Sequence, residues 1–97
     1  MTISYEQARE RVRTELQPTW TNGTFCIDDR KIVENKDMYV FEVGAREFLK
    51  DQDPQFAELG GVTVVYKADG RVGTLPSVQV ATDTTIQQRE NPSPTFA

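Results

Sequence analysis

Apolar residues near the start of the chain recur at intervals of three and four, which predicts one amphipathic helix. The residues in this pattern are Tyr5, Ala8, Val12 and Leu16. Ser4, followed three residues later by Gln7, forms a capping box at the expected start. The helix is therefore expected from Tyr5 to about Leu16, where Pro18 closes the segment.

Further along the chain, apolar residues alternate with polar ones, which predicts strands. The expected strands are 24–27 with a brief continuation at 32–33, 38–43, 62–67 and 71–75. Asp69-Gly70, between the last two, suits the positive backbone angles of a tight hairpin turn. The apolar pattern breaks at 28–31, so the first strand is expected to be bulged or divided. This order predicts an antiparallel meander of about four strands, with the helix on one face and the other face open.

The end of the chain is polar and contains Pro92 and Pro94. It lacks the apolar side chains that offset the entropy of ordering. We therefore expect a single α+β domain over residues 1–81, in which the N-terminal helix packs on the meander sheet. A polar, disordered tail is expected over residues 82–97.

The residues that most enzymes use for catalysis are scarce. The 97-residue chain has no histidine, the commonest general base and transition-metal ligand, and a single cysteine, Cys26. One cysteine cannot form a thiolate zinc cluster, and Asp51 does not open a calcium loop because Phe56 stands where glycine is needed. We therefore expect no catalytic residue, no metal and no cofactor. Cys26 is expected to be a small buried strand residue.

The chain also lacks the marks of a membrane or secreted protein. No apolar run approaches the roughly 18 residues that a membrane span requires. The N-terminus leads into a charged amphipathic segment rather than a signal peptide. A lone cysteine agrees with a reducing compartment. These features predict a cytoplasmic protein without a membrane partner.

The net charge of −4 arises from one part of the chain. Residues 28–58 contain nine acidic and five basic residues, whereas acids and bases cancel on either side of this segment. An acidic surface repels nucleic-acid backbones and attracts a basic protein, with steering that weakens in salt. The segment therefore predicts a basic protein partner and no nucleic acid. Its alternative role is to keep a small domain soluble.

Several short motifs between residues 3 and 77 share the pattern of one known family. The motifs are Ser4-Tyr5-Glu6-Gln7-Ala8, Tyr39-Val40-Phe41, Arg46 to Leu49, Asp53, Leu59-Gly60-Gly61, Val64-Val65, Asp69-Gly70 and Val72 through Leu75-Pro76-Ser77. Together they resemble the YrhB-domain family, also called immunity protein 35. Met38 stands where that family usually has tryptophan, and Val62-Thr63 where proline is common. The resemblance implies a bacterial immunity protein, which neutralises a toxin deployed between competing cells and performs no chemistry.

Such a protein would act by stoichiometric occlusion of the toxin's active site or of a surface beside it. A toxin that acts on nucleic acid would present a basic cleft matching the acidic segment. The expected partner-binding residues are Asp28, Asp29, Tyr39, Glu42, Glu47, Phe48, Asp51, Asp53 and Glu58. In the strand 38–43, Tyr39 faces the opposite side from Glu42, so Tyr39 would instead be structural if its side lined the core.

Two other functions are open on the sequence. One is a self-associating module, in which an exposed edge strand or the open sheet face pairs with a second copy, so that the chain is a monomer or a homodimer. The other is a small-ligand carrier in which Trp20 and Tyr39 line a pocket.

Overall fold

The computed structural model describes residues 2–57 and 61–96 of the chain. Its elements follow in the order α1 (Tyr5–Leu16), η1 (Gln17–Thr19), β1 (Phe25–Glu34), β2 (Met38–Ala45), α2 (Arg46–Leu49), η2 (Pro54–Phe56), β3 (Val62–Tyr66), β4 (Val72–Leu75), α3 (Ser77–Ala81) and β5 (Gln87–Glu90). The two η elements are single 3-10 turns. Glu58, one of the expected partner-binding residues, lies outside the described residues.

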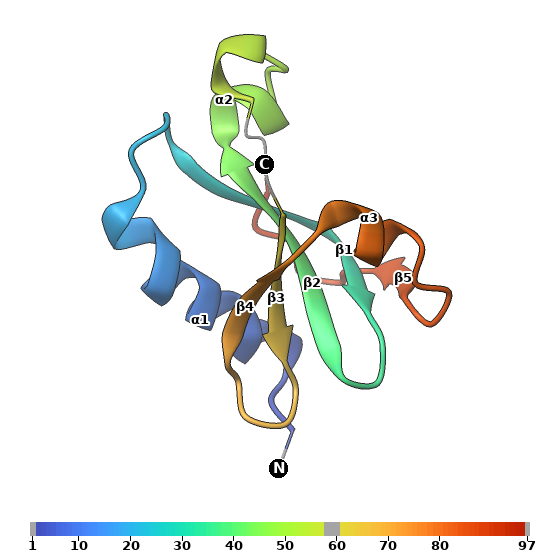
Figure 1. The fold of residues 1–97 in the computed structure, drawn as a ribbon. Coiled ribbons are helices and arrows are strands. Elements are labelled where there is room, and N and C mark those ends of the chain that lie inside the picture. The colour runs from blue at the N-terminus through green and yellow to red at the C-terminus, as the bar shows by residue number, and fades with distance from the viewer. Residues whose placement is uncertain (1, 58–60, 97) are drawn as a thin grey trace.

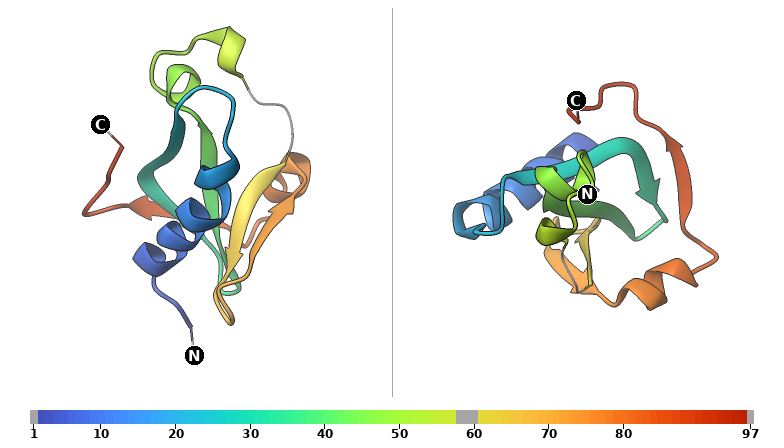
Figure 2. Two further views of the ribbon diagram at one scale, coloured as in Figure 1. Left: turned by 90° about the vertical axis from the view of Figure 1, so that its left-hand side faces the viewer. Right: turned by 90° about the horizontal axis from the view of Figure 1, so that it is seen from above.

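The strands form one antiparallel sheet in the order β4-β3-β2-β1-β5 (Figure 1). The first four follow one another as the predicted meander, and β5 adds a fifth strand beside β1. α1 lies on one side of the sheet, whereas α3 lies on the other and connects the two edge strands (Figure 2). The predicted α+β class, with an N-terminal helix on an antiparallel sheet, is confirmed. None of the helices in the described part of the chain is long and apolar enough to cross a membrane.

The capping box predicted from the sequence begins α1. The Gln7 amide donates to Ser4 Oγ at 3.1 Å, and the Ser4 amide donates to Gln7 Oε1 at 2.9 Å. These two bonds satisfy amide groups that would otherwise have no partner within the helix. The helix then buries the side of Tyr5, Ala8 and Val12 against the sheet.

The core lies between α1 and the sheet and is built around aromatic rings. Tyr5 stacks on Phe41 at a centroid distance of 5.1 Å and meets Tyr39 edge to face at 5.6 Å. The Tyr39 hydroxyl donates to the Ile3 carbonyl oxygen at 3.1 Å, so its polar end is satisfied inside the fold. The strand turns the Tyr39 ring towards α1, which supports the structural alternative for this residue, and its expected contact with a partner stays a prediction.

The irregular stretch expected at 28–31 lies inside the single strand β1. Asp28 pairs with Glu42 across the sheet, and the register between β1 and β2 shifts between Asp28 and Val33. Successive strand residues point to opposite faces, so the side chains of the neighbouring acids Asp28 and Asp29 lie on opposite sides of the sheet. Asp29 is buried on the side of α1 and bonds to Arg9, whereas Asp28 lies on the opposite side of the sheet.

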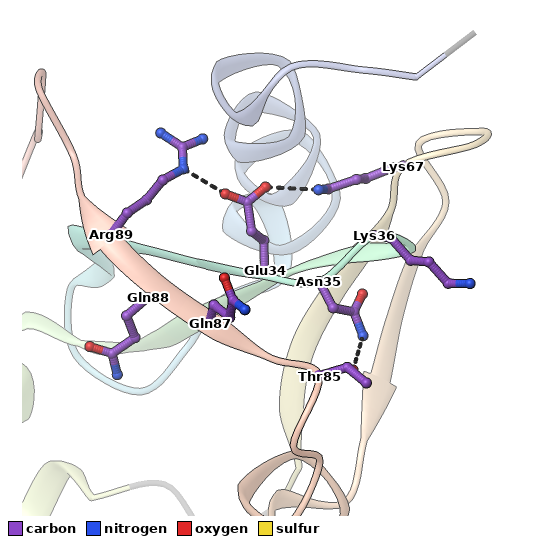
Figure 3. Close-up of a pocket in the computed structure, with 8 residues that line it drawn as sticks. All are labelled: Glu34, Asn35, Lys36, Lys67, Thr85, Gln87, Gln88 and Arg89. Atoms are coloured by element: carbon purple, nitrogen blue, oxygen red, sulfur yellow. Dashed lines mark hydrogen bonds and ion pairs between the residues drawn. The ribbon is translucent and has the colours of Figure 1, made fainter.

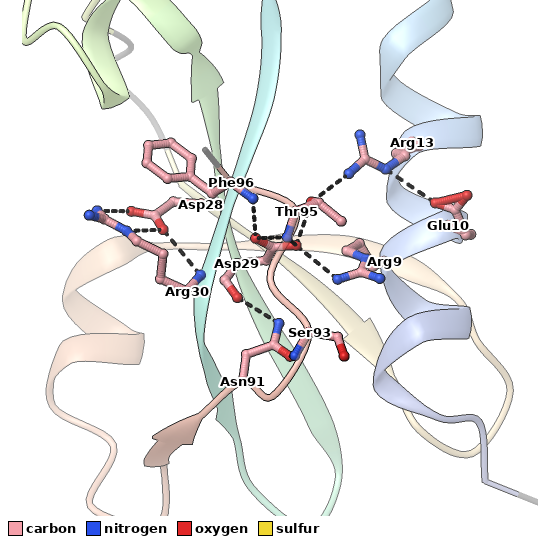
Figure 4. A network of polar contacts seen from close by, with 10 residues as sticks. All are labelled: Arg9, Glu10, Arg13, Asp28, Asp29, Arg30, Asn91, Ser93, Thr95 and Phe96. Carbon is pink, nitrogen blue, oxygen red and sulfur yellow. Dashed lines mark hydrogen bonds and ion pairs between the residues drawn. The ribbon is translucent and has the colours of Figure 1, made fainter.

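The end of the chain differs from the expected disordered tail. Gln87–Glu90 forms β5, and residues 91–96, which we call the C-terminal strap, fold back between β1 and α1 (Figure 4). Asn91 is buried and its side-chain amide donates to the Asp29 carbonyl oxygen at 2.6 Å. The structure thus places residues 82–96 against the sheet, whereas the sequence predicts a disordered tail that begins at residue 82. The reason is that polar bonds, and not apolar burial, hold this segment.

The C-terminal strap is held by the side chain of Asp29, which is fully buried. Its carboxylate accepts hydrogen bonds from the Thr95 amide at 2.9 Å, the Thr95 hydroxyl at 2.6 Å and the Phe96 amide at 2.9 Å. Arg9 adds an ion pair at 2.8 Å. Burial alone would raise the pKa of Asp29, but these bonds outweigh it and hold the pKa below the ordinary value. The Asp29 side chain is therefore used inside the fold, and its expected contact with a partner stays a prediction that this burial does not favour.

Replacing Asp29 with asparagine should lower the free energy of unfolding by about 3–5 kcal/mol, because it leaves Arg9 without its buried partner. Asp28→Asn is the matched control. Its ion pair with the exposed Arg30 is of a kind that contributes at most about 1 kcal/mol. Urea unfolding at neutral pH measures both variants, and equal losses would contradict the structural role of Asp29.

The difference in unfolding free energy between the wild type and Asp29→Asn should depend on pH. A carboxyl group with a lowered folded pKa stabilises the protein above its unfolded pKa, and the stabilisation is lost as the pH falls through the folded pKa. The gap between the wild type and Asp29→Asn should therefore narrow below about pH 3.9, the ordinary aspartate value.

Removal of residues 91–97 should also destabilise the protein, because the Asp29 carboxylate then keeps only Arg9. The truncation and Asp29→Asn break the same network, so their effects should be far from additive. A double-mutant cycle from urea unfolding measures the coupling. Additive losses would show that the C-terminal strap and Asp29 act independently.

Candidate functional site

The side of the sheet opposite α1 carries a hollow of about 570 Å³. Its floor is formed by the apolar side chains Val33, Val40 and Val62. Its polar border is formed by Asp28, Arg30, Lys31, Glu42 and Gln88. The alternation of β2 explains this arrangement, because Val40 and Glu42 face away from the side on which Tyr39 and Phe41 enter the core.

A second hollow of about 510 Å³ adjoins the first. The two share Asp28, Arg30 and Glu42, and the second is completed by Phe48, Leu49 and Gln52. We call the surface formed by both hollows the open face. It brings together three of the predicted partner-binding residues, which are Asp28, Glu42 and Phe48. Apolar area enclosed by polar side chains is also the usual anatomy of a protein interface.

The two acids of the open face are in different electrostatic states. Arg30 holds Asp28 through two bonds, Nε to Oδ1 at 2.9 Å and Nη2 to Oδ2 at 2.7 Å, which keep the pKa of Asp28 below its usual value. Among the described residues, none forms an ion pair or a hydrogen bond with the Glu42 side chain. Glu42 is partly exposed, and the desolvation of its covered part together with the negative charge of Asp28 raises its pKa, against a smaller opposing effect of Arg30. Within the described part of the chain, Glu42 is thus a carboxylate without an ion-pair partner of its own.

Phe48 is presented by α2, which is tied to the start of β1. The Arg46 amide donates to the Thr24 carbonyl oxygen at 2.8 Å. The Glu47 carboxylate in turn accepts from the Thr24 amide and the Thr24 hydroxyl, both at 2.9 Å. These bonds fix α2 and leave Phe48 38% exposed beside the acids. The sequence predicts that Glu47 contacts a partner. In the structure its carboxylate binds the backbone and side chain of Thr24.

The loop acids that follow do not join the open face. Asp53 caps η2, where its side chain accepts from the Gln55 amide at 3.0 Å. Asp51 is exposed, and Gln52 between the two acids borders the second hollow in their place. The structure thus assigns Asp53 a local capping role and leaves Asp51 as an exposed acid beside the site.

The apolar residues and the arginine that surround the two acids of the open face are not among those predicted from the sequence. They are Arg30, Val33, Val40 and Val62. Strand parity was the available signal for Val40, which alternates with Tyr39. The placement of Val33 depends on the register shift in β1, for which the sequence has only the interrupted apolar pattern. Cys26 is a buried strand residue as expected, and burial raises the pKa of its thiol.

The described residues give little basis for metal chemistry or for the expected ligand pocket. No group of three or more His, Cys, Asp or Glu side chains within 2–57 and 61–96 is placed to hold a metal ion. Trp20 packs edge to face on Phe25 at 5.5 Å, and its indole donates to the Asn22 carbonyl oxygen at 2.7 Å. Tyr39 belongs to the core instead. The two rings thus take part in separate structural contacts.

No protein-family model matches the chain, and neither the curated proteins nor the solved structures contain a match. The resemblance to the YrhB-domain family therefore stays a prediction from the short motifs.

Glu42→Gln should stabilise the free protein at pH 7 by a few tenths of a kcal/mol, the low end of the range for cross-strand charge pairs, because water and Arg30 screen the exposed carboxylate. A carboxyl group with a raised folded pKa destabilises the fold once it is ionised, so the gain should vanish below about pH 4.3, the ordinary glutamate value. Urea unfolding at pH 7 and pH 4 measures the difference. Glu15→Gln, on the exposed side of α1, is the control and should change neither value. Destabilisation by Glu42→Gln at pH 7 would contradict this electrostatic account.

Proposed function

We propose that the protein is a non-catalytic immunity protein, which binds a basic bacterial toxin with its open face and neutralises it by stoichiometric occlusion. The convergence of Asp28, Glu42 and Phe48 around an apolar floor is the observation that carries this proposal. The short motifs that resemble the YrhB-domain family support it independently. The protein would act in the cytoplasm of the bacterium that produces the toxin.

The open face carries two acids and two bases, and the pairing among them favours a basic group of a partner. Asp28 is paired with Arg30 and Lys31 with Glu90, whereas Glu42 forms no ion pair among the described residues. A lysine or arginine of the partner would pair with Glu42, and it would relieve the repulsion between Asp28 and Glu42 across the strands. The ionised Glu42 is expected to cost stability in the free protein. Residues that reduce stability are common at functional sites. Here the bound partner would supply the cation that Glu42 lacks in the free protein.

The apolar part of the open face supplies the contact area. Val33, Val40 and Val62 form a floor that the aliphatic stem of a long basic side chain can cover. Phe48 stands at the edge as a partly exposed aromatic side chain, the type that often anchors an interface. The complex would cover the toxin's catalytic cleft, or a surface beside it, without any reaction on the part of this protein.

The open face is less suited to pairing with a second copy of itself. In a two-fold contact the same surface meets itself, so a second copy would bring no net positive charge to the unpaired Glu42. At one edge of the sheet, β5 has only four residues, all exposed, with Arg89 and Glu90 among them. Short, charged edge strands resist pairing with other strands. These features favour a foreign partner over self-association.

Affinity capture from the producing organism tests the proposal. The wild type should retain a basic toxin domain in about equal amount, and the purified complex should lack the toxin's activity. Glu42→Lys should weaken the captured complex by at least about tenfold, because it places like charges together at the interface. Glu15→Lys changes the net charge equally on the exposed side of α1 and should bind like the wild type.

Two outcomes would contradict the proposal. Capture of the bait alone as a dimer would favour a self-associating module. Equal weakening by Glu42→Lys and Glu15→Lys would show that the partner responds to overall charge and not to the open face.

A further inference from the structure

Another pocket, of about 340 Å³, lies where the end of β1 meets β5 and the turn after β3 (Figure 3). Its charged lining residues are Glu34, Lys36, Lys67 and Arg89. Three bases against one acid leave an excess of two positive charges, in a chain whose net charge is −4. The pocket is therefore an electropositive site on an otherwise acidic protein.

Glu34 shows how this pocket holds a carboxylate. Lys67 Nζ lies 2.7 Å from Glu34 Oε1 and Arg89 Nε lies 2.6 Å from Oε2, so the two cations approach from opposite sides (Figure 3). Burial raises the pKa of Glu34, but the bonds to Lys67 and Arg89 lower it below the ordinary value. The Lys67 ammonium also lies 4.6 Å from the centroid of the Tyr39 ring. The side chains of Glu34 and Lys67 are 20% and 15% exposed, which limits their screening by water.

One internal carboxylate does not use all the donors of this pocket. Arg89 binds Glu34 through Nε alone, so both of its Nη groups are left for other acceptors within the described part of the chain. Lys36 borders the same pocket and points away from Glu34 (Figure 3). The Gln87 side-chain amide adds a neutral donor to the lining. A planar guanidinium edge with adjacent donors is well suited to two oxygens of one acid group.

We propose that this pocket binds a small molecule through a carboxylate or phosphate group, with Arg89 as the main contact and Lys67 and Lys36 as supporting charges. The volume of the pocket is at the small end of the range for ligand sites. Glu34 competes with the ligand for the same cations, so it sets a low affinity and confines binding to well-charged oxyanions. Apart from Gln88, which borders both, the pocket shares no lining residue with the open face, and the proposal does not rest on toxin binding.

Titration with inorganic phosphate and with citrate, followed by amide NMR at constant ionic strength, tests this site. Saturable shifts are expected at the residues that line the pocket, including Gln88, which borders both sites, and at none of the other residues that line the open face. Comparison of the two probes shows whether phosphate or carboxylate is preferred.

Three variants should change the affinity for the probe in different ways. Arg89→Gln should weaken binding roughly tenfold, because a charge-assisted bidentate contact is lost. Glu34→Gln should tighten it by about fivefold or more, because it removes the competing charge while keeping the shape of the side chain. Lys50→Gln, an exposed base outside this pocket, should leave binding unchanged. The NMR spectrum of each variant reports whether the fold is retained.

The site would be refuted if neither probe gave saturable shifts in the wild type. It would also be refuted if Lys50→Gln weakened binding as much as Arg89→Gln, because that result would show that anions respond to the overall charge of the protein and not to this pocket. A loss of binding in a well-folded Glu34→Gln variant would contradict the competition between Glu34 and the ligand.

Discussion

The buried carboxylate of Asp29 is the interaction on which the rest of the structure depends. A charge removed from water is tolerated only when it is paired and hydrogen-bonded, and here the partners come from α1 and from the C-terminal strap. One side chain of β1 therefore fastens both the first helix and the last residues of the chain to the same side of the sheet. The open face lies on the opposite side of the sheet.

This arrangement divides the acidic residues by role. Asp29, Glu47 and Asp53 hold the backbone through amide and hydroxyl donors, whereas Asp28 and Glu42 lie opposite one another on the open face. The acidic segment is thus neither uniformly a binding surface nor merely a source of solubility. Its members differ because strand parity sends neighbours to opposite faces, and because turns and helix starts require acceptors for their free amides.

The periodic parts of the fold could be predicted from the sequence. The α1 pattern with its Ser4 cap and the meander strands follow from local spacing, which packing then reinforces. β5 and the C-terminal strap could not, since Gln87–Glu90 has no apolar side chain and its partner is distant in the sequence. Asp28 and Asp29 also look alike in a sequence, and only their position relative to α1 separates a surface acid from a buried one.

The central claim is that Asp29 orders the C-terminal strap as part of the fold. Amide hydrogen exchange of the full-length protein tests it most directly, because the Thr95 and Phe96 amides donate to this carboxylate. Both amides should exchange far more slowly than those of an unstructured peptide, with protection that approaches that of the β1 amides. Exchange of Thr95 and Phe96 at the rate of a free chain, alongside a protected sheet, would contradict the account.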